Sequence, residues 1–130
     1  MVDSLGDRIK RYENMERRFV MPRMPIIIRV DGKAFHSLTR GCDKPFDKNI
    51  IDCMNHTAKS LMEGIQNAKI AYIQSDEISI LLNDFIEYDT QQWFGGNINK
   101  IVSISAAIAS TAFTNAYGKI ALFDSRAFAF

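Results

Sequence analysis

The sequence predicts an α+β domain of the ferredoxin-like class, in which an antiparallel sheet carries two helices on one face. Three observations support this class. The 130 residues are 47% hydrophobic, which is enough for one core. Short apolar runs typical of strands alternate with longer stretches of helical spacing, in the order β-α-β-β-α-β after an N-terminal helix. Right-handed crossovers in this order place the first and third strands side by side and antiparallel in the middle of the sheet.

The first third of the chain supplies a helix, a strand and a loop. Ser4 is a typical helix cap, and apolar residues at helical spacing predict one amphipathic helix over residues 4–19. The almost continuously apolar run over residues 25–31 predicts the first strand, which Gly32 ends. Residues 33–46 are typical of a loop and carry several basic side chains.

The second helix and a hairpin follow. Asp47 caps a stretch with a helical apolar stripe, so a helix should begin there. Two apolar runs, residues 70–73 and 78–82, are separated by four polar residues and predict a β-hairpin with an acidic tip.

The last elements complete the pattern. Residues 85–96 predict an irregular connection, after which Asn97 caps a second long helix that Gly118 ends. The apolar run over residues 120–123 predicts the fourth strand.

Composition excludes several classes of protein. The net charge is +1, so any binding of nucleic acid or anionic membrane must use a local patch. Two cysteines, Cys42 and Cys53, are too few for a disulfide framework or a zinc site. The apolar runs are short and the first residues do not form a signal peptide, so we expect a cytoplasmic protein with no membrane partner.

Two carboxylates are the candidate catalytic residues. Asp31 ends the first strand and Asp76 immediately precedes the third, so the predicted topology brings them to one edge of the sheet. Two adjacent carboxylates repel each other unless a cation neutralises them or one binds a proton. Oxygen ligands of this kind suit Mg²⁺, and the pair therefore predicts a magnesium site.

A basic loop follows the first of these acids. Gly32 would let backbone amides approach an anion, and Lys33, Arg40 and Lys44 could screen phosphate charge. Carboxylates, metal and a basic loop are what nucleotidyl transfer by two metal ions requires. Taken singly, Asp31-Gly32 and the 75–77 tip are common turn sequences, and only their convergence favours a site.

Two neighbouring residues keep two interpretations each. Glu77 is either an outer metal ligand or a side chain that points to solvent, and the second is preferred. His36 is either a loop histidine with a structural hydrogen bond or a phosphate contact.

The sequence resembles the tRNA(His) guanylyltransferase family and its Thg1-like relatives. The similar stretches occur in family order and cover nearly the whole chain; they are Arg11-Tyr12-Glu13, Arg29-Val30-Asp31-Gly32-Lys33-Ala34-Phe35-His36, Lys44-Pro45-Phe46-Asp47, Gln74-Ser75-Asp76-Glu77-Ile78-Ser79 and Phe123-Asp124-Ser125-Arg126. Family members are typically about twice this length, so we expect residues 1–130 to form a palm-like catalytic domain in the N-terminal part of a longer protein.

The resemblance implies an activity and its ligands. It implies a 3′–5′ polymerase that activates the 5′ end of a tRNA with ATP and adds GTP there, either to tRNA(His) or to repair 5′ ends. Asp31, Asp76 and the carbonyl of Gly32 would hold two Mg²⁺ ions. The nucleotide-binding residues implied are Asp31, Gly32, Lys33, Ala34, Phe35, His36, Lys44, Ser75 and Asp76. Partners would be tRNA, nucleoside triphosphates and further copies of the chain, as a tetramer.

Three other functions remain open from the sequence. A nucleotide cyclase of the diguanylate cyclase type shares the topology and the acidic tip, but its tip has two glycines where Gln74 and Ser75 stand here. An RNA-recognition module would stack bases on aromatic side chains of its central strands, and the predicted central strands are aliphatic. A small-ligand regulatory domain would bind without Mg²⁺.

Overall fold

The computed structural model describes residues 4–42 and 47–130, and it has the predicted order of elements. These are α1 (Leu5–Met15), β1 (Ile26–Gly32), α2 (Phe35–Leu38), α3 (Lys48–Gly64), β2 (Ala68–Gln74), β3 (Glu77–Leu82), the 3₁₀ turn η1 (Trp93–Gly96), α4 (Ile98–Tyr117) and β4 (Phe123–Ala129). In the described part of the chain, no helix is both long and apolar enough to span a membrane.

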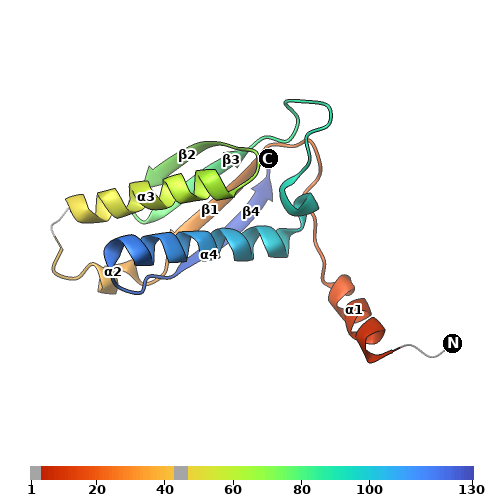
Figure 1. Cartoon of the computed structure of the whole chain (residues 1–130), viewed down its shortest axis with the longest axis horizontal. Helices are drawn as coiled ribbons and strands as arrows, with labels where there is room; N and C mark the ends of the chain where they lie inside the picture. Colours follow the sequence, from red (N-terminus) through yellow and green to blue (C-terminus); the bar gives the residue numbers. More distant parts are fainter. Residues whose placement is uncertain (1–3, 43–46) are drawn as a thin grey trace.

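The sheet confirms the predicted fold class. Its strand order is β2-β3-β1-β4, and every neighbouring pair is antiparallel. β1 and β3 are therefore the two central strands, in register from Ile26 opposite Leu82 to Asp31 opposite Glu77. Figure 1 shows α3 and α4 side by side on one face of this sheet.

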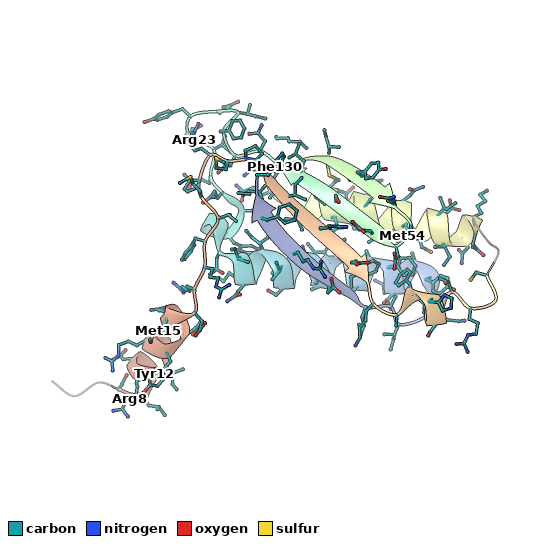
Figure 2. The ribbon with its side chains drawn as sticks, turned by 180° about the vertical axis from the view of Figure 1, so that it is seen from behind. Arg8, Tyr12, Met15, Arg23, Met54 and Phe130 are labelled. Atoms are coloured by element: carbon teal, nitrogen blue, oxygen red, sulfur yellow. The ribbon has the colours of Figure 1, made fainter. Side chains whose placement is uncertain are left out.

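The core lies between the sheet and the two helices. Alternate residues of the central strands face the helices and are buried, among them Ile28 and Val30 on β1 and Ile80 on β3. The intervening residues face the other side, which no helix covers and which Figure 2 shows from behind. The chemistry-bearing residues of β1, Arg29 and Asp31, alternate with buried residues and so lie on this open face.

The predicted caps are where the sequence placed them. The side chains of Ser4, Asp47 and Asn97 accept hydrogen bonds from the amides of Asp7, Ile50 and Lys100, at the starts of α1, α3 and α4. Gly118 ends α4 with a φ of 86°, in the left-handed region that glycine tolerates.

The fourth strand departs from the prediction. Residues 120–122 lie outside it, and β4 runs from Phe123 to Ala129. Thr114 explains the difference, because its hydroxyl donates to the carbonyl of Ala121 and accepts from its amide, which ties this residue to α4. The prediction placed this strand too early because its inward positions after Phe123 are the small residues Ser125, Ala127 and Ala129.

The predicted N-terminal helix and the predicted loop also differ in detail. α1 ends at Met15, four residues early, and none of its residues is buried. Figure 1 shows α1 projecting away from the sheet and its helices. Residues 33–46 were predicted as loop, but α2 forms within them because Phe35 is anchored in the core.

Candidate active site

The two predicted catalytic segments meet at one edge of the sheet. Asp31 is the last but one residue of β1 and pairs in register with Glu77, the first residue of β3. The amide of Gly32 donates to the backbone carbonyl of Asp76 at 2.9 Å, so the backbones beside the two aspartates are in direct contact. The convergence predicted from topology is therefore present.

The tip of the hairpin is a tight turn. Gln74 and Glu77 pair across it, which leaves Ser75 and Asp76 as its two central residues. Ser75 has a φ of 57°, the left-handed conformation that two-residue hairpin turns use. The turn holds Asp76 at the carboxyl end of β1, with its side chain partly buried.

The two acids of the tip have opposite electrostatic surroundings. Burial is the largest cause and raises the pKa of Asp76. A hydrogen bond from its own backbone amide lowers this pKa by less, and the negative charges of Asp31 and Glu77 raise it further. A hydrogen bond from Arg29 lowers the pKa of Glu77, and the same guanidinium forms an ion pair with it. Arg29 therefore balances the charge of Glu77, whereas that of Asp76 is opposed by its neighbours.

This arrangement leaves Asp31 and Asp76 as the candidate metal ligands. Within residues 4–42 and 47–130, neither forms an ion pair with a lysine or arginine, and no three His, Cys, Asp or Glu side chains are grouped closely enough to hold a metal ion. Two carboxylates and a backbone carbonyl suit Mg²⁺, which commonly takes one or two carboxylates and completes its ligands with water and substrate phosphate. The donor set therefore fits Mg²⁺ bound together with a nucleotide.

Two backbone amides at the end of β1 bind within the protein. The amide of Gly32 donates to the carbonyl of Asp76, and the amide of Lys33 donates to the carbonyl of Leu122 at 2.7 Å. The prediction that backbone amides of the loop approach a bound anion therefore stays a prediction for the residues that follow Lys33. Gly32 has a packing reason instead, because a Cβ atom there would lie 2.4 Å from the ring of Phe35.

Besides Asp31, Gly32 and Asp76, the predicted nucleotide-binding residues fall into three groups. Lys33, Ala34, His36 and Ser75 are exposed and are available to a ligand. Phe35 is buried, at 6% exposure, so its ring is mostly inaccessible. Lys44 lies outside the described residues.

Arg29, Asp124 and Arg126 were not identified from the sequence as residues near the site. The register places Asp124 of β4 opposite Asp31, and Arg126 of β4 opposite Arg29. Arg126 also contributes to lowering the pKa of Glu77. The alternation of side chains along β1 could have shown that Arg29 lies on the same face as Asp31. The two residues of β4 could not be found in this way, because the predicted fourth strand was placed at residues 120–123.

Comparisons with known proteins give the chain a family. The sequence model of the family described as "Thg1: tRNAHis guanylyltransferase" matches residues 6–130. The tRNA(His) guanylyltransferase of Schizosaccharomyces pombe is 32% identical over 116 residues, which are 87% of this chain and 41% of the fungal protein. The chain thus spans about two fifths of that relative.

Solved structures agree. A bacterial tRNA(His) guanylyltransferase (Thg1)-like protein in complex with GTP superposes with a TM-score of 0.96 at 46% identity, over 98% of this chain and 59% of the other. The tRNA(His) guanylyltransferase of Saccharomyces cerevisiae, at 22% identity and a TM-score of 0.80, has the same fold. Since the family match runs through nearly the whole sequence, the chain belongs to the Thg1, or tRNAHis guanylyltransferase, family.

Proposed function

We propose that this chain is the catalytic domain of a Mg²⁺-dependent nucleotidyltransferase that adds nucleotides to the 5′ end of tRNA, in the 3′–5′ direction. The observation that carries the proposal is the contact between the segments of Asp31 and Asp76 at the end of β1. Membership of the Thg1 family gives this pair its chemical context.

Asp31, Asp76 and the carbonyl of Gly32 would hold the metal, as two Mg²⁺ ions. Bound there, Mg²⁺ would neutralise triphosphate charge and stabilise the oxygens that attack and leave during phosphoryl transfer. The raised pKa of Asp76 supports this role, because a carboxylate partly buried beside negative charges is stabilised by a cation. Glu77 is less suited to it, because Arg29 already pairs with it.

The nucleotide would lie over the loop after β1 and the hairpin tip. Lys33 and His36 are exposed there and can approach phosphate oxygens, and Ser75 lies beside Asp76 at the tip. Bacterial Thg1-like proteins similar to this chain were solved in complex with GTP and with ATP, which supports these two nucleotides as substrates. We keep Lys44 as a proposed phosphate contact.

The RNA substrate follows from the relatives rather than from the site. Several are named tRNA(His) guanylyltransferase, which supports tRNA as the acceptor, used either for tRNA(His) guanylylation or for more general repair of 5′ ends. Assembly as a tetramer remains part of the proposal on the basis of the family resemblance.

The alternatives are less well supported. The family match does not favour a nucleotide cyclase, nor a small-ligand regulatory domain. An RNA-recognition module is opposed by the central strands, whose residues on the open face are Ile27, Arg29, Ser79 and Leu81, none of them aromatic. The buried aliphatic residues of the same strands, such as Ile28 and Ile80, face the helices instead.

The test combines binding with product analysis. Calorimetry should detect GTP binding that requires Mg²⁺, is abolished by EDTA and is lost in Asp31→Ala and Asp76→Ala. Glu63→Ala, which removes an exposed carboxylate of α3, is the matched control and should bind like the parent.

With a labelled tRNA that lacks its first nucleotide, we expect Mg²⁺-dependent growth at the 5′ end. Growth at the 3′ end would contradict the direction. A cyclic dinucleotide formed from GTP alone would support the cyclase instead, and equal binding of GTP by Asp76→Ala in EDTA would refute the site.

A further inference from the structure

The space beneath Gly32 is filled by an aromatic ring. β1 turns alternate residues toward the helices, so Gly32 lies on the same side of the strand as the buried Val30. A Cβ atom built on Gly32 would lie 2.4 Å from Cδ1, 2.6 Å from Cε1 and 2.9 Å from Cγ of Phe35. The ring thus occupies the volume that any other residue at position 32 would need.

Phe35 is held there by two further rings. Its centroid lies 5.0 Å from that of Phe113 on α4 and 5.2 Å from that of Phe123 on β4, at interplanar angles of 59° and 63°. Phe113 and Phe123 also contact each other, at 5.7 Å. All three rings are buried, with exposures of 0 to 6%. This aromatic cluster joins α2, α4 and β4 directly below the end of β1.

The backbone of Gly32 and Lys33 is also held at its sides. The amide of Gly32 donates to Asp76 and that of Lys33 to Leu122. Ala34 then reverses the chain with a φ of 55°, a conformation that residues other than glycine adopt only when their surroundings enforce it. The reversal is what brings Phe35 back under the strand.

We propose that the ring of Phe35 is a positioning group for the nucleotide, which acts through Gly32 and does not itself touch the ligand. Its ring sets the height and orientation of the Gly32–Lys33 backbone, and with it the carbonyl and the exposed side chains that face Mg²⁺-GTP. This inference rests on the proposed function. It concerns the buried ring alone, and the expected contact of Phe35 with the nucleotide stays a prediction.

A steric exchange tests the proposal. Gly32→Ala forces a methyl group into the ring and should weaken Mg²⁺-GTP binding by about tenfold or more, since tenfold corresponds to ~1.4 kcal/mol. Phe35→Val removes Cδ1 and Cε1, the atoms of the two shortest contacts. The double variant Gly32→Ala/Phe35→Val should then bind several times more tightly than Gly32→Ala alone.

Phe113→Leu is the matched control. It removes part of the same cluster but none of the three atoms nearest to a Cβ at position 32, which all belong to Phe35. Combined with Gly32→Ala it should not restore binding. Calorimetry gives Kd at a temperature where circular dichroism shows every variant folded, and the melting temperature of each variant is recorded. A merely structural role of the cluster would make Kd follow the melting temperature in all variants alike.

The results distinguish a failure of the proposed function from a failure of the positioning role of Phe35. Absence of Mg²⁺-GTP binding in the parent chain overturns the proposed function, and this inference with it. Binding in the parent with no recovery in the double variant overturns this inference alone. If Gly32→Ala does not fold, Phe35→Leu and Phe113→Leu decide: the proposal requires weaker binding in Phe35→Leu, and equal effects of the two overturn it.

Discussion

At the scale of single residues, Asp76 and Glu77 carry adjacent carboxyl groups whose pKa values folding shifts in opposite directions. Burial and like charges raise the pKa of Asp76, whereas Arg29 lowers that of Glu77. A raised carboxyl pKa means that the folded state holds the proton more tightly than the unfolded chain, and a lowered pKa means the reverse. The ionised form of Asp76 therefore opposes folding at neutral pH, and the ionised form of Glu77 favours it.

Asp76→Asn should make the metal-free protein more stable at pH 7. The stabilising effect of the raised pKa is present below the unfolded value of about 3.9 and is lost as pH rises through the folded value. Asparagine does not titrate, so only the parent loses stability in this way as the pH rises. We expect thermal melts in EDTA to show a higher melting temperature for Asp76→Asn at pH 7 and no such gain near pH 3. A lower melting temperature at pH 7 would contradict the raised pKa of Asp76 in the folded state.

Glu77→Gln should have the opposite effect. The lowered pKa of Glu77 contributes stability above its unfolded value of about 4.3, and this stability is lost as pH falls through the folded value. The variant should melt slightly below the parent at pH 7, and the difference should vanish in acid. The effect is small because Arg29 is exposed. In the background Arg29→Gln, Glu77→Gln should change the melting temperature much less, whereas an undiminished change would show that the ion pair is not its cause.

At the scale of elements, local signals located most helix ends but not every strand. Ser4, Asp47 and Asn97 carry short polar side chains that satisfy the free amides of a first turn, a requirement that depends on no distant contact. β4 depends on distant contacts, because Ser110 and Thr114 of α4 bind the backbone of Phe123 and Ala121. The start of that strand is set by the helix beside it and could not be found from the run itself.

The N-terminal arm is a second element that spacing alone misjudged. The apolar residues at helical spacing predicted an amphipathic helix, a pattern typical of a helix packed on a core, but Leu5 and Met15 are 75% and 80% exposed. Figure 2 shows Arg8, Tyr12 and Met15 on α1, away from the sheet. The arm is attached after its helix, where Ile98 donates to the carbonyl of Arg18 and Val20 donates to that of Gly96.

A chain that begins at Glu16 should therefore fold with nearly unchanged stability. α1 contributes no buried residue, and surface changes of this kind are usually within about 0.5 kcal/mol. We expect the melting temperature to stay within roughly 2 °C of the parent, as measured by circular dichroism. A chain that begins at Met21 is the control: it also loses the buried Val20 and both backbone contacts, and it should melt clearly lower. A large loss on removing α1 alone would mean that the arm packs on a surface.

At the scale of the whole molecule, the connection order is what made the candidate site predictable. Strand order β2-β3-β1-β4 follows from β-α-β-β-α-β, so the adjacency of Asp31 and Asp76 needed no knowledge of side chains. Two other features could not be predicted without the positions of the side chains, because both depend on register and rotamer. These are the pairing of Arg29 with Glu77 and the ring of Phe35 under Gly32. The sequence thus predicts where the site lies better than how its parts are held.

The strand order also places every described part of the site in one sheet with one core, so we expect ligand binding at the site to stabilise the whole domain. β1, the hairpin tip and β4 share one sheet and one core, so Mg²⁺-GTP bound at Asp31 and Asp76 should stabilise the whole domain. At a hundredfold excess over Kd the gain is about 2.7 kcal/mol, which should raise the melting temperature of a domain of this size by about 10 °C. EDTA should abolish the shift, and Asp31→Ala should lack it while Glu63→Ala retains it. A shift of equal size with GTP in EDTA would mean that the nucleotide binds away from the two aspartates. At the aspartates, a cation is needed to offset the repulsion between their negative charges and the triphosphate.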